Sequence, residues 1–130
     1  MDSGAGFFSG NALKNGKNGW FVGQFMPPSA GLAQQSAVEV KWGQHPKGER
    51  RRGLSLYKTS TTIAILISGR FVTRLIINQF EQQIVLKTPG DYLVFGPGIP
   101  HSWEALEDSL VISVRFPSLQ SDLLEQSENS

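Results

Sequence analysis

The sequence predicts an all-β domain, because short apolar segments alternate with glycine- and proline-rich turns along most of its length. The 130 residues include 14 glycines and 7 prolines, and many short strands joined by such corners are typical of a sandwich or barrel. No long segment has the apolar spacing of an amphipathic helix. A chain of this length can bury one hydrophobic core, so we expect a single compact domain.

Each strand is predicted from a local pattern, taken here in chain order. Residues 20–25 form a first apolar segment that ends at Pro27 and Pro28, and residues 38–42 alternate between apolar and charged side chains. Residues 62–68 are nearly all apolar, as in a strand that is buried on both faces. Further strands are predicted at residues 71–79, 82–87, 91–95 and 110–116, with a hairpin near residues 78–81.

The last of these strands has two alternating faces. One is apolar and makes the better core stripe, formed by Leu110, Ile112, Val114 and Phe116. Arg115 lies on the opposite face with Ser113, so we expect it outside, as a surface or dimer-contact charge. If that face is interior instead, Arg115 could hold a carboxylate or phosphate through two parallel hydrogen bonds.

The most informative segment covers residues 88–103. Thr88-Pro89-Gly90-Asp91 has proline at its second position and glycine at its third, which predicts a type II turn. Residues 96–100 form a second glycine- and proline-rich corner, and His101 follows it directly. A rigid corner fixes the direction of such a histidine, which suits a ligand or proton carrier. The alternative is a histidine that lies in a turn without any functional role.

This segment resembles the second signature of the cupin family, G-x5-P-x-G-x2-H-x3-N. Gly90, Gly98 and His101 stand at its spacing, whereas Gly96 stands in the proline place and Ala105 replaces the asparagine.

The resemblance extends over residues 37–118, and this part of the sequence is similar to small single-domain bacterial cupins. Residues 61–71 look like the strand, glycine turn and strand that close the first cupin signature, and residues 42–45 and 115–118 add to the likeness. The resemblance implies a double-stranded β-helix, the cupin-type jelly-roll barrel. Composition divides the rest of the chain: residues 1–19 are rich in Gly, Asn and Ser and predict a flexible arm before a barrel at 20–118. Residues 119–130 are a polar tail, which we expect to be a frayed helix or disordered.

The family binds a divalent metal with two histidines and a glutamate from the first signature and one histidine from the second. Here the glutamate place, seven residues before Gly69, holds Thr62. If residues 46–60 are an inserted loop, His45 takes the second histidine place and Gly43 takes the first. The resemblance therefore implies a depleted metal site.

A reduced site remains chemically possible, because imidazole and carboxylate ligands suit a divalent metal such as Zn, Fe, Ni or Mn. Its candidate ligands are His45, His101 and Glu49, which follows His45 by four residues. Glu104 is a second carboxylate candidate, although it faces away from His101 on a strand.

A pocket without metal is the other interpretation of the same residues. Trp103 shares a face with His101, which would place an imidazole beside an indole wall; plain core filling is the alternative for Trp103. We expect His45 and His101 to face one cavity. Strict alternation groups His45 with Lys41, so either this polar face lines the cavity or Gly43 forms a bulge that reverses the direction.

Three functions follow as hypotheses. The sequence favours a small-molecule-binding barrel with ligand-binding residues His101, Trp103 and His45. The alternatives are a metal-dependent enzyme of the dioxygenase or isomerase type, using His45, Glu49 and His101, and a non-catalytic scaffold or interaction protein. Fold analogy cannot choose between them.

Composition limits the partners and the compartment. Twelve Lys and Arg against eleven Asp and Glu give no basic surplus for nucleic acid. The aliphatic run at residues 63–67 is too short to span a membrane. The chain has no cysteine, which excludes disulfides and thiolate chemistry. We expect a cytoplasmic homodimer, because small open barrels leave edge strands that invite pairing.

Overall fold

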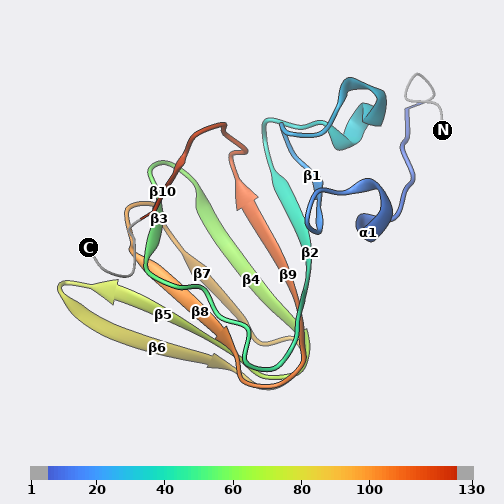
Figure 1. The fold of residues 1–130 in the computed structure, drawn as a ribbon. Helices are drawn as coiled ribbons and strands as arrows, with labels where there is room; N and C mark the ends of the chain where they lie inside the picture. The colour runs from blue at the N-terminus through green and yellow to red at the C-terminus, as the bar shows by residue number, and fades with distance from the viewer. Residues whose placement is uncertain (1–5, 126–130) are drawn as a thin grey trace.

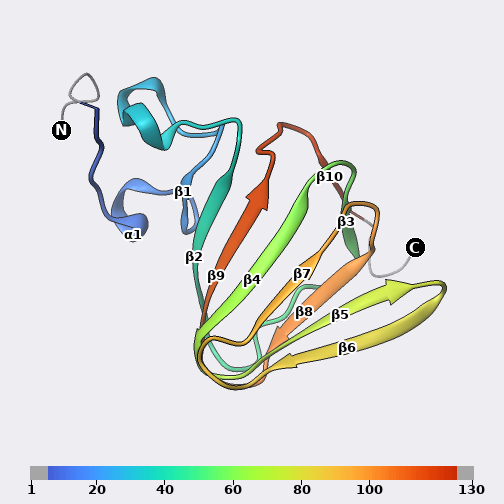
Figure 2. The same ribbon diagram turned by 180° about the vertical axis from the view of Figure 1, so that it is seen from behind.

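Two antiparallel sheets of five strands each form the barrel in the computed structural model, which describes residues 6–125. The strand orders are β1-β2-β9-β4-β7 and β10-β3-β8-β5-β6. Figures 1 and 2 show the sheets meeting at the end where β2 stops and β9 starts, and diverging toward the other end. The elements are α1 (Ala12–Asn15), β1 (Trp20–Val22), the 3-10 helix η2 (Pro28–Ala33), β2 (Glu39–His45), β3 (Ser55–Tyr57), β4 (Thr61–Ser68), β5 (Phe71–Ile77), β6 (Phe80–Leu86), β7 (Tyr92–Phe95), β8 (His101–Ala105), β9 (Ser109–Phe116) and β10 (Leu123–Glu125).

The tight turns have the conformations that their residues favour. Asn78 and Gln79 have positive φ values of 51° and 71° and connect β5 to β6, which is the backbone of a type I′ hairpin. Gly90 has φ +96°, and the N–H of Asp91 donates to the carbonyl of Thr88 at 2.8 Å, as a type II turn requires. This turn leads into β7 and thereby sets the direction of the chain toward His101.

The assignment of the inner face of β9 from the sequence was wrong. β2 pairs with β9 from Glu39 to His45 without a register shift, so no bulge reverses its direction. Arg115 is 8% exposed and Ser113 faces the same inner space, whereas Phe116, on the supposed core stripe, is 41% exposed. The polar face turns inward because the barrel interior is a partly polar cavity in which Arg115 finds partners, rather than a packed apolar core.

The main apolar core fills the end at which the sheets meet. It contains Leu66, which is fully buried, together with its neighbours Ala64, Phe71, Leu86, Ala105 and Val111. A Leu→Ala change at such a site typically costs about 2–5 kcal/mol. This core packs the two sheets against each other, and three of its residues, Ala64, Phe71 and Val111, also line the cavity between the sheets.

The segments before β2 and after β9 lie against the barrel. Phe8 packs on a second apolar cluster of Met26, Ala30 and Ala33, and β10 pairs with β3. The sequence predicted a frayed helix or disorder for residues 119–130; residues 123–125 form a strand, and residues 126–130 lie outside the described part. The division into arm, barrel and tail stays a prediction. Within residues 6–125, no helix is long and apolar enough to cross a membrane.

Candidate functional site

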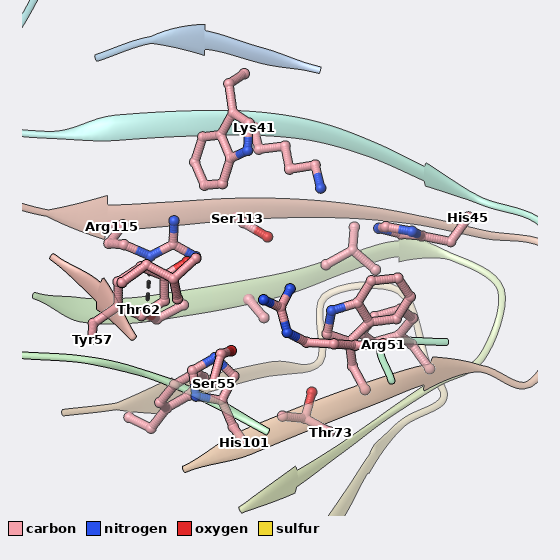
Figure 3. A pocket seen from close by; sticks show the side chains of 17 residues that line it. Lys41, His45, Arg51, Ser55, Tyr57, Thr62, Thr73, His101, Ser113 and Arg115 are labelled. Carbon is pink, nitrogen blue, oxygen red and sulfur yellow. Dashed lines mark hydrogen bonds between the residues drawn. The ribbon is translucent and has the colours of Figure 1, made fainter. Parts of the chain in front are cut away.

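A cavity of about 220 Å³ lies between the two sheets (Figure 3). Both sheets contribute side chains to it, including Leu123 of the edge strand β10, and the loop before β3 contributes Arg51. Its lining residues are Trp20, Lys41, His45, Arg51, Ser55, Tyr57, Thr62, Ala64, Phe71, Thr73, Phe95, His101, Trp103, Val111, Ser113, Arg115 and Leu123. Three residues singled out from the sequence, His45, His101 and Trp103, thus face one cavity.

His101 begins β8 directly after the rigid corner. Its Nδ1 lies 3.0 Å from the carbonyl oxygen of Ile99 and donates to it, while Nε2 lies 3.4 Å from the hydroxyl of Ser55. Because Nδ1 carries the proton, Nε2 is the acceptor nitrogen. The ring stacks on Tyr57 at 5.8 Å. Burial lowers the pKa of His101, the hydrogen bond to Ile99 opposes this, and nearby cations lower it further. The imidazole is therefore neutral at pH 7.

His45 ends β2 on the other side of the cavity. Its Nδ1 is 2.5 Å from Oε1 of Glu49, which is 42% exposed. Its ring lies 4.6 Å from Trp103 and 5.3 Å from Phe71. Burial lowers the pKa of His45 more than the hydrogen bond to Glu49 raises it. Like His101, this imidazole is neutral at pH 7, and Glu49 fixes which nitrogen carries the proton.

Gly43 makes room for the ring of His45. A Cβ at Gly43 would lie 2.8 Å from Nε2 of His45, closer than a Cβ atom approaches another heavy atom in folded proteins. If residues 46–60 are counted as an inserted loop, Gly43 occupies the place of the first metal-binding histidine in the cupin signature. A side chain at position 43 would therefore displace the imidazole of His45 and crowd the carbonyl oxygen of Val111.

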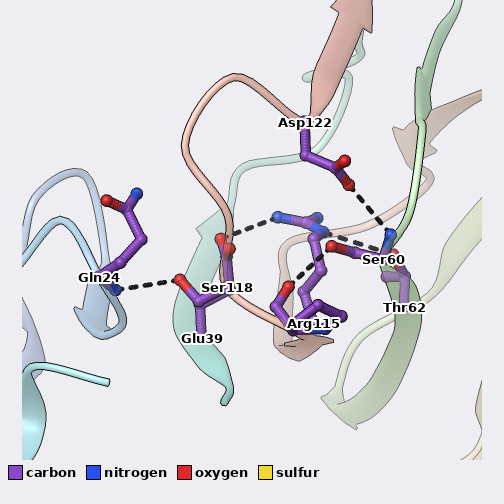
Figure 4. A network of polar contacts seen from close by, with 8 residues as sticks. Gln24, Glu39, Ser60, Thr62, Arg115, Ser118 and Asp122 are labelled. Carbon is purple, nitrogen blue, oxygen red and sulfur yellow. Dashed lines mark hydrogen bonds and ion pairs between the residues drawn. The ribbon is translucent and has the colours of Figure 1, made fainter. Parts of the chain in front are cut away.

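Arg115 is the most extensively bound side chain of the cavity. Its Nη1 lies 3.2 Å from Oε2 of Glu39, and its Nε lies 3.4 Å from the hydroxyl of Thr62 (Figure 4). The guanidinium lies 3.8 Å from the ring centre of Tyr57 and 4.7 Å from that of Trp20. Burial lowers the pKa of Arg115, and Tyr57 and Glu39 oppose this. These contacts keep the charge buried and hold the side chain in one position.

Two further cationic side chains were not assigned to the site from the sequence. Lys41 faces the cavity from β2, and Arg51 reaches it from the loop before β3, where its guanidinium also binds Glu125 at 2.5 Å. The alternation of residues 38–42 contained the signal for Lys41, because it placed Lys41 on the face of His45. Arg51 lies in an irregular loop, where the sequence marks it only as part of a basic cluster with Lys47, Arg50 and Arg52. The favoured interpretation of that cluster was a solvated loop, and an anion-contacting rim was the alternative.

The candidate metal ligands are only partly brought together. Within residues 6–125, no group of three or more His, Cys, Asp or Glu side chains could hold a metal ion. Glu49 contacts His45 rather than lining the cavity. Glu104 binds Arg74 at 3.2 Å on the other face of β8. The donor set in the described residues therefore does not fit the metal centre implied by the resemblance.

Comparison with solved structures identifies the fold. Oxalate decarboxylase from Bacillus subtilis matches with a TM-score of 0.60 at 19% identity over 72% of this chain and 25% of its own. An oxalate oxidase matches with a TM-score of 0.66 at 15% identity, over 91% of this chain and 62% of its own. KdgF from Halomonas sp. matches with a TM-score of 0.52 at 23% identity, over 68% and 74%. No protein-family model and no curated protein sequence matches the chain.

These three proteins all have the cupin fold, and so does this chain. The jelly-roll barrel expected from residues 88–103 is confirmed. The chain spans only about a quarter of the length of the oxalate decarboxylase that it resembles, and at these identities the likeness concerns the fold and not the activity.

Proposed function

We propose that the protein binds a small molecule in the cavity between its two sheets. The observation that carries this proposal is the lining itself, in which aromatic walls surround a few converging polar groups. Small-molecule sites in proteins have this composition. For a protein that acts only as a scaffold, we expect a barrel interior fully packed with apolar side chains. The polar lining of this cavity therefore supports the binding hypothesis over the scaffold hypothesis.

The size of the cavity limits the ligand. Its 220 Å³ lies below the range of roughly 300–1,000 Å³ that is usual for drug-sized ligands. The ligand is therefore a small metabolite rather than a polymer or a nucleotide-sized cofactor.

A fragment library measured by thermal shift, followed by NMR, tests the proposal. We expect hits to raise the melting temperature and to shift backbone signals of β4, β8 and β9. Ser113→Leu extends a branched side chain into the cavity and should abolish this binding. Ser102→Leu, on the opposite face of β8 from His101, is the matched control and should keep it.

Two outcomes would contradict the proposal. One is a diverse library without a single compound that shifts signals of cavity-lining residues. The other is a hit that binds Ser113→Leu as tightly as the unchanged protein, because such a compound binds elsewhere.

A metal-dependent enzyme using His45, Glu49 and His101 is the second candidate. It is favoured by the two histidines in one cavity and by a structural neighbour, the Bacillus subtilis oxalate decarboxylase, whose Mn(II) centres have been studied. The mismatch of the donor set is against it, so we derive no reaction step from a metal. Metal analysis of the purified protein decides: near-stoichiometric metal that is lost in both His45→Ala and His101→Ala would establish this alternative.

A further inference from the structure

We propose that the ligand of this cavity is a small planar carboxylate, bound at its anionic end by Lys41, Arg51 and Arg115. This inference rests on the proposed small-molecule function and narrows it to one chemical class. Four features of the cavity support it: the charge of its lining, an ammonium group that no described carboxylate contacts, a preorganised guanidinium, and aromatic rings on two sides.

The lining carries cations without anions. Lys41, Arg51 and Arg115 all face the cavity, and none of the described residues that line it is aspartate or glutamate. The carboxylates that neutralise the two arginines, Glu39 and Glu125, lie outside the lining. Three positive groups that converge on a partly enclosed space attract an anion, because the low local dielectric strengthens their interaction with it.

Lys41 is the cation of the lining that no described carboxylate contacts directly, although the charge of Glu49 acts on it from outside the cavity. Among the described residues, no carboxylate or other acceptor receives a hydrogen bond from its ammonium group, and its one ring contact is Trp20 at 5.7 Å. Figure 3 shows its side chain extending from β2 toward the same space as the guanidinium of Arg51. Burial lowers the pKa of Lys41 and the charge of Arg115 lowers it further, while the carboxylate of Glu49 opposes this shift and Arg51 adds to it. A carboxylate in the cavity would supply the missing partner.

Arg115 has hydrogen-bond donors left for such a ligand. Its Nη1 binds Glu39 and its Nε binds Thr62, so within residues 6–125 the two N–H groups of Nη2 have no hydrogen-bond acceptor. Tyr57 and Trp20 hold the guanidinium by ring contacts. Because the group is already held in place, little side-chain entropy is lost when a carboxylate binds.

The rings around the cavity fit a flat ligand. Phe71 and Trp103 stack with ring centres 5.3 Å apart and planes inclined by 24°. Tyr57 and His101 stack at 5.8 Å with planes inclined by 19°. Both pairs line the cavity, so its walls offer flat apolar surfaces to the body of the ligand while the cations bind its charged end.

The test uses benzoate, with benzamide as the neutral probe of the same shape. The indole N–H signals in a ¹H–¹⁵N NMR spectrum report on the place of binding, because Trp20 and Trp103 line the cavity and Trp42 does not. We expect benzoate to shift the signals of Trp20 and Trp103 but not that of Trp42. Benzamide should bind at least tenfold more weakly.

The variant Lys41→Met tests the role of the Lys41 ammonium group in binding the carboxylate. It keeps most of the aliphatic side chain and should weaken benzoate binding at least tenfold while leaving the weak binding of benzamide unchanged. Lys87→Met removes an equal charge from an exposed position outside the lining and should leave both affinities unchanged. A circular dichroism melt of each variant shows that it is folded.

Three results would overturn the inference. If benzamide binds as tightly as benzoate, the cavity takes neutral ligands, and the proposed function stands without its anionic class. If Lys41→Met and Lys87→Met weaken benzoate equally, only the overall charge matters. If neither probe shifts the cavity signals, the inference fails, and the broader fragment screen decides the proposed function separately.

Discussion

The buried ion pair between Arg115 and Glu39 should be strongly coupled to the stability of the barrel. The two side chains are only 10% and 12% exposed, and Nη1 and Oε2 are 3.2 Å apart. At that distance two unit charges interact by about 5 kcal/mol if the effective dielectric constant is about 20. Desolvation of both groups offsets much of this attraction, so the pair as a whole contributes little net stability.

A double-mutant cycle separates these terms. Arg115→Met leaves the carboxylate of Glu39 buried without its cation, and breaking a buried pair in this way costs about 3–5 kcal/mol. Glu39→Leu should cost a similar amount. The double variant replaces both charges by apolar groups of similar size, so it should be considerably more stable than the sum of the two single effects predicts.

Urea unfolding followed by tryptophan fluorescence measures all four proteins of the cycle. We expect a coupling free energy of at least about 2 kcal/mol between the two positions, within the range seen for residues in one network. A coupling below about 0.5 kcal/mol, with additive effects, would refute the reasoning. It would mean that water screens the pair and that the cavity is not the low-dielectric site described here.

Four further predictions follow from other contacts. Lys41→Met should raise the free energy of unfolding at pH 7, because burial lowers the pKa of Lys41 and its charge is disfavoured in the folded state. This gain, measured by urea unfolding, should shrink as the pH rises toward about 10.5, where the lysine loses its charge in the unfolded state as well. The pKa values of His45 and His101 are lowered in the folded protein, so protonation of either imidazole favours the unfolded state. Thermal melts should therefore show a melting temperature that falls as the pH drops below about 6.5. The variant His101→Gln should make this dependence on pH less steep. Asp122→Ala should cost about 1–3 kcal/mol in urea unfolding, because it removes the acceptor of two backbone N–H groups just before β4. The homodimer, with its contact expected near residues 20–25, stays a prediction; light scattering at micromolar concentration checks it, and a monomeric protein would contradict the expectation.

The turns and the position of His101 could be predicted from the sequence because they depend on local backbone sterics. Gly90 adopts the positive φ that its place in the turn requires, whatever the rest of the chain does. The second corner, which contains Gly98 with φ +76°, lies directly before β8, so His101 begins that strand. The likeness to the second cupin signature rests on the same local features, and it therefore predicted the fold correctly.

The short strands β3 and β10 could not be predicted in this way. Each has three residues, too few for alternation to be recognised. They form because each finds a partner in the folded chain: β3 pairs with β8 and β10 pairs with β3. Their pairing closes the side of the cavity on which Tyr57 and Leu123 lie.

The direction of Arg115 was decided by tertiary structure alone. Alternation in residues 110–116 separates two faces but does not say which one turns inward, and the usual preference for an apolar interior gave the wrong answer. Arg115 is buried because Glu39, Thr62 and Tyr57, distant in sequence, converge on it when the sheets close. A charge can be buried only where such partners assemble around it, and that assembly exists only in the folded barrel.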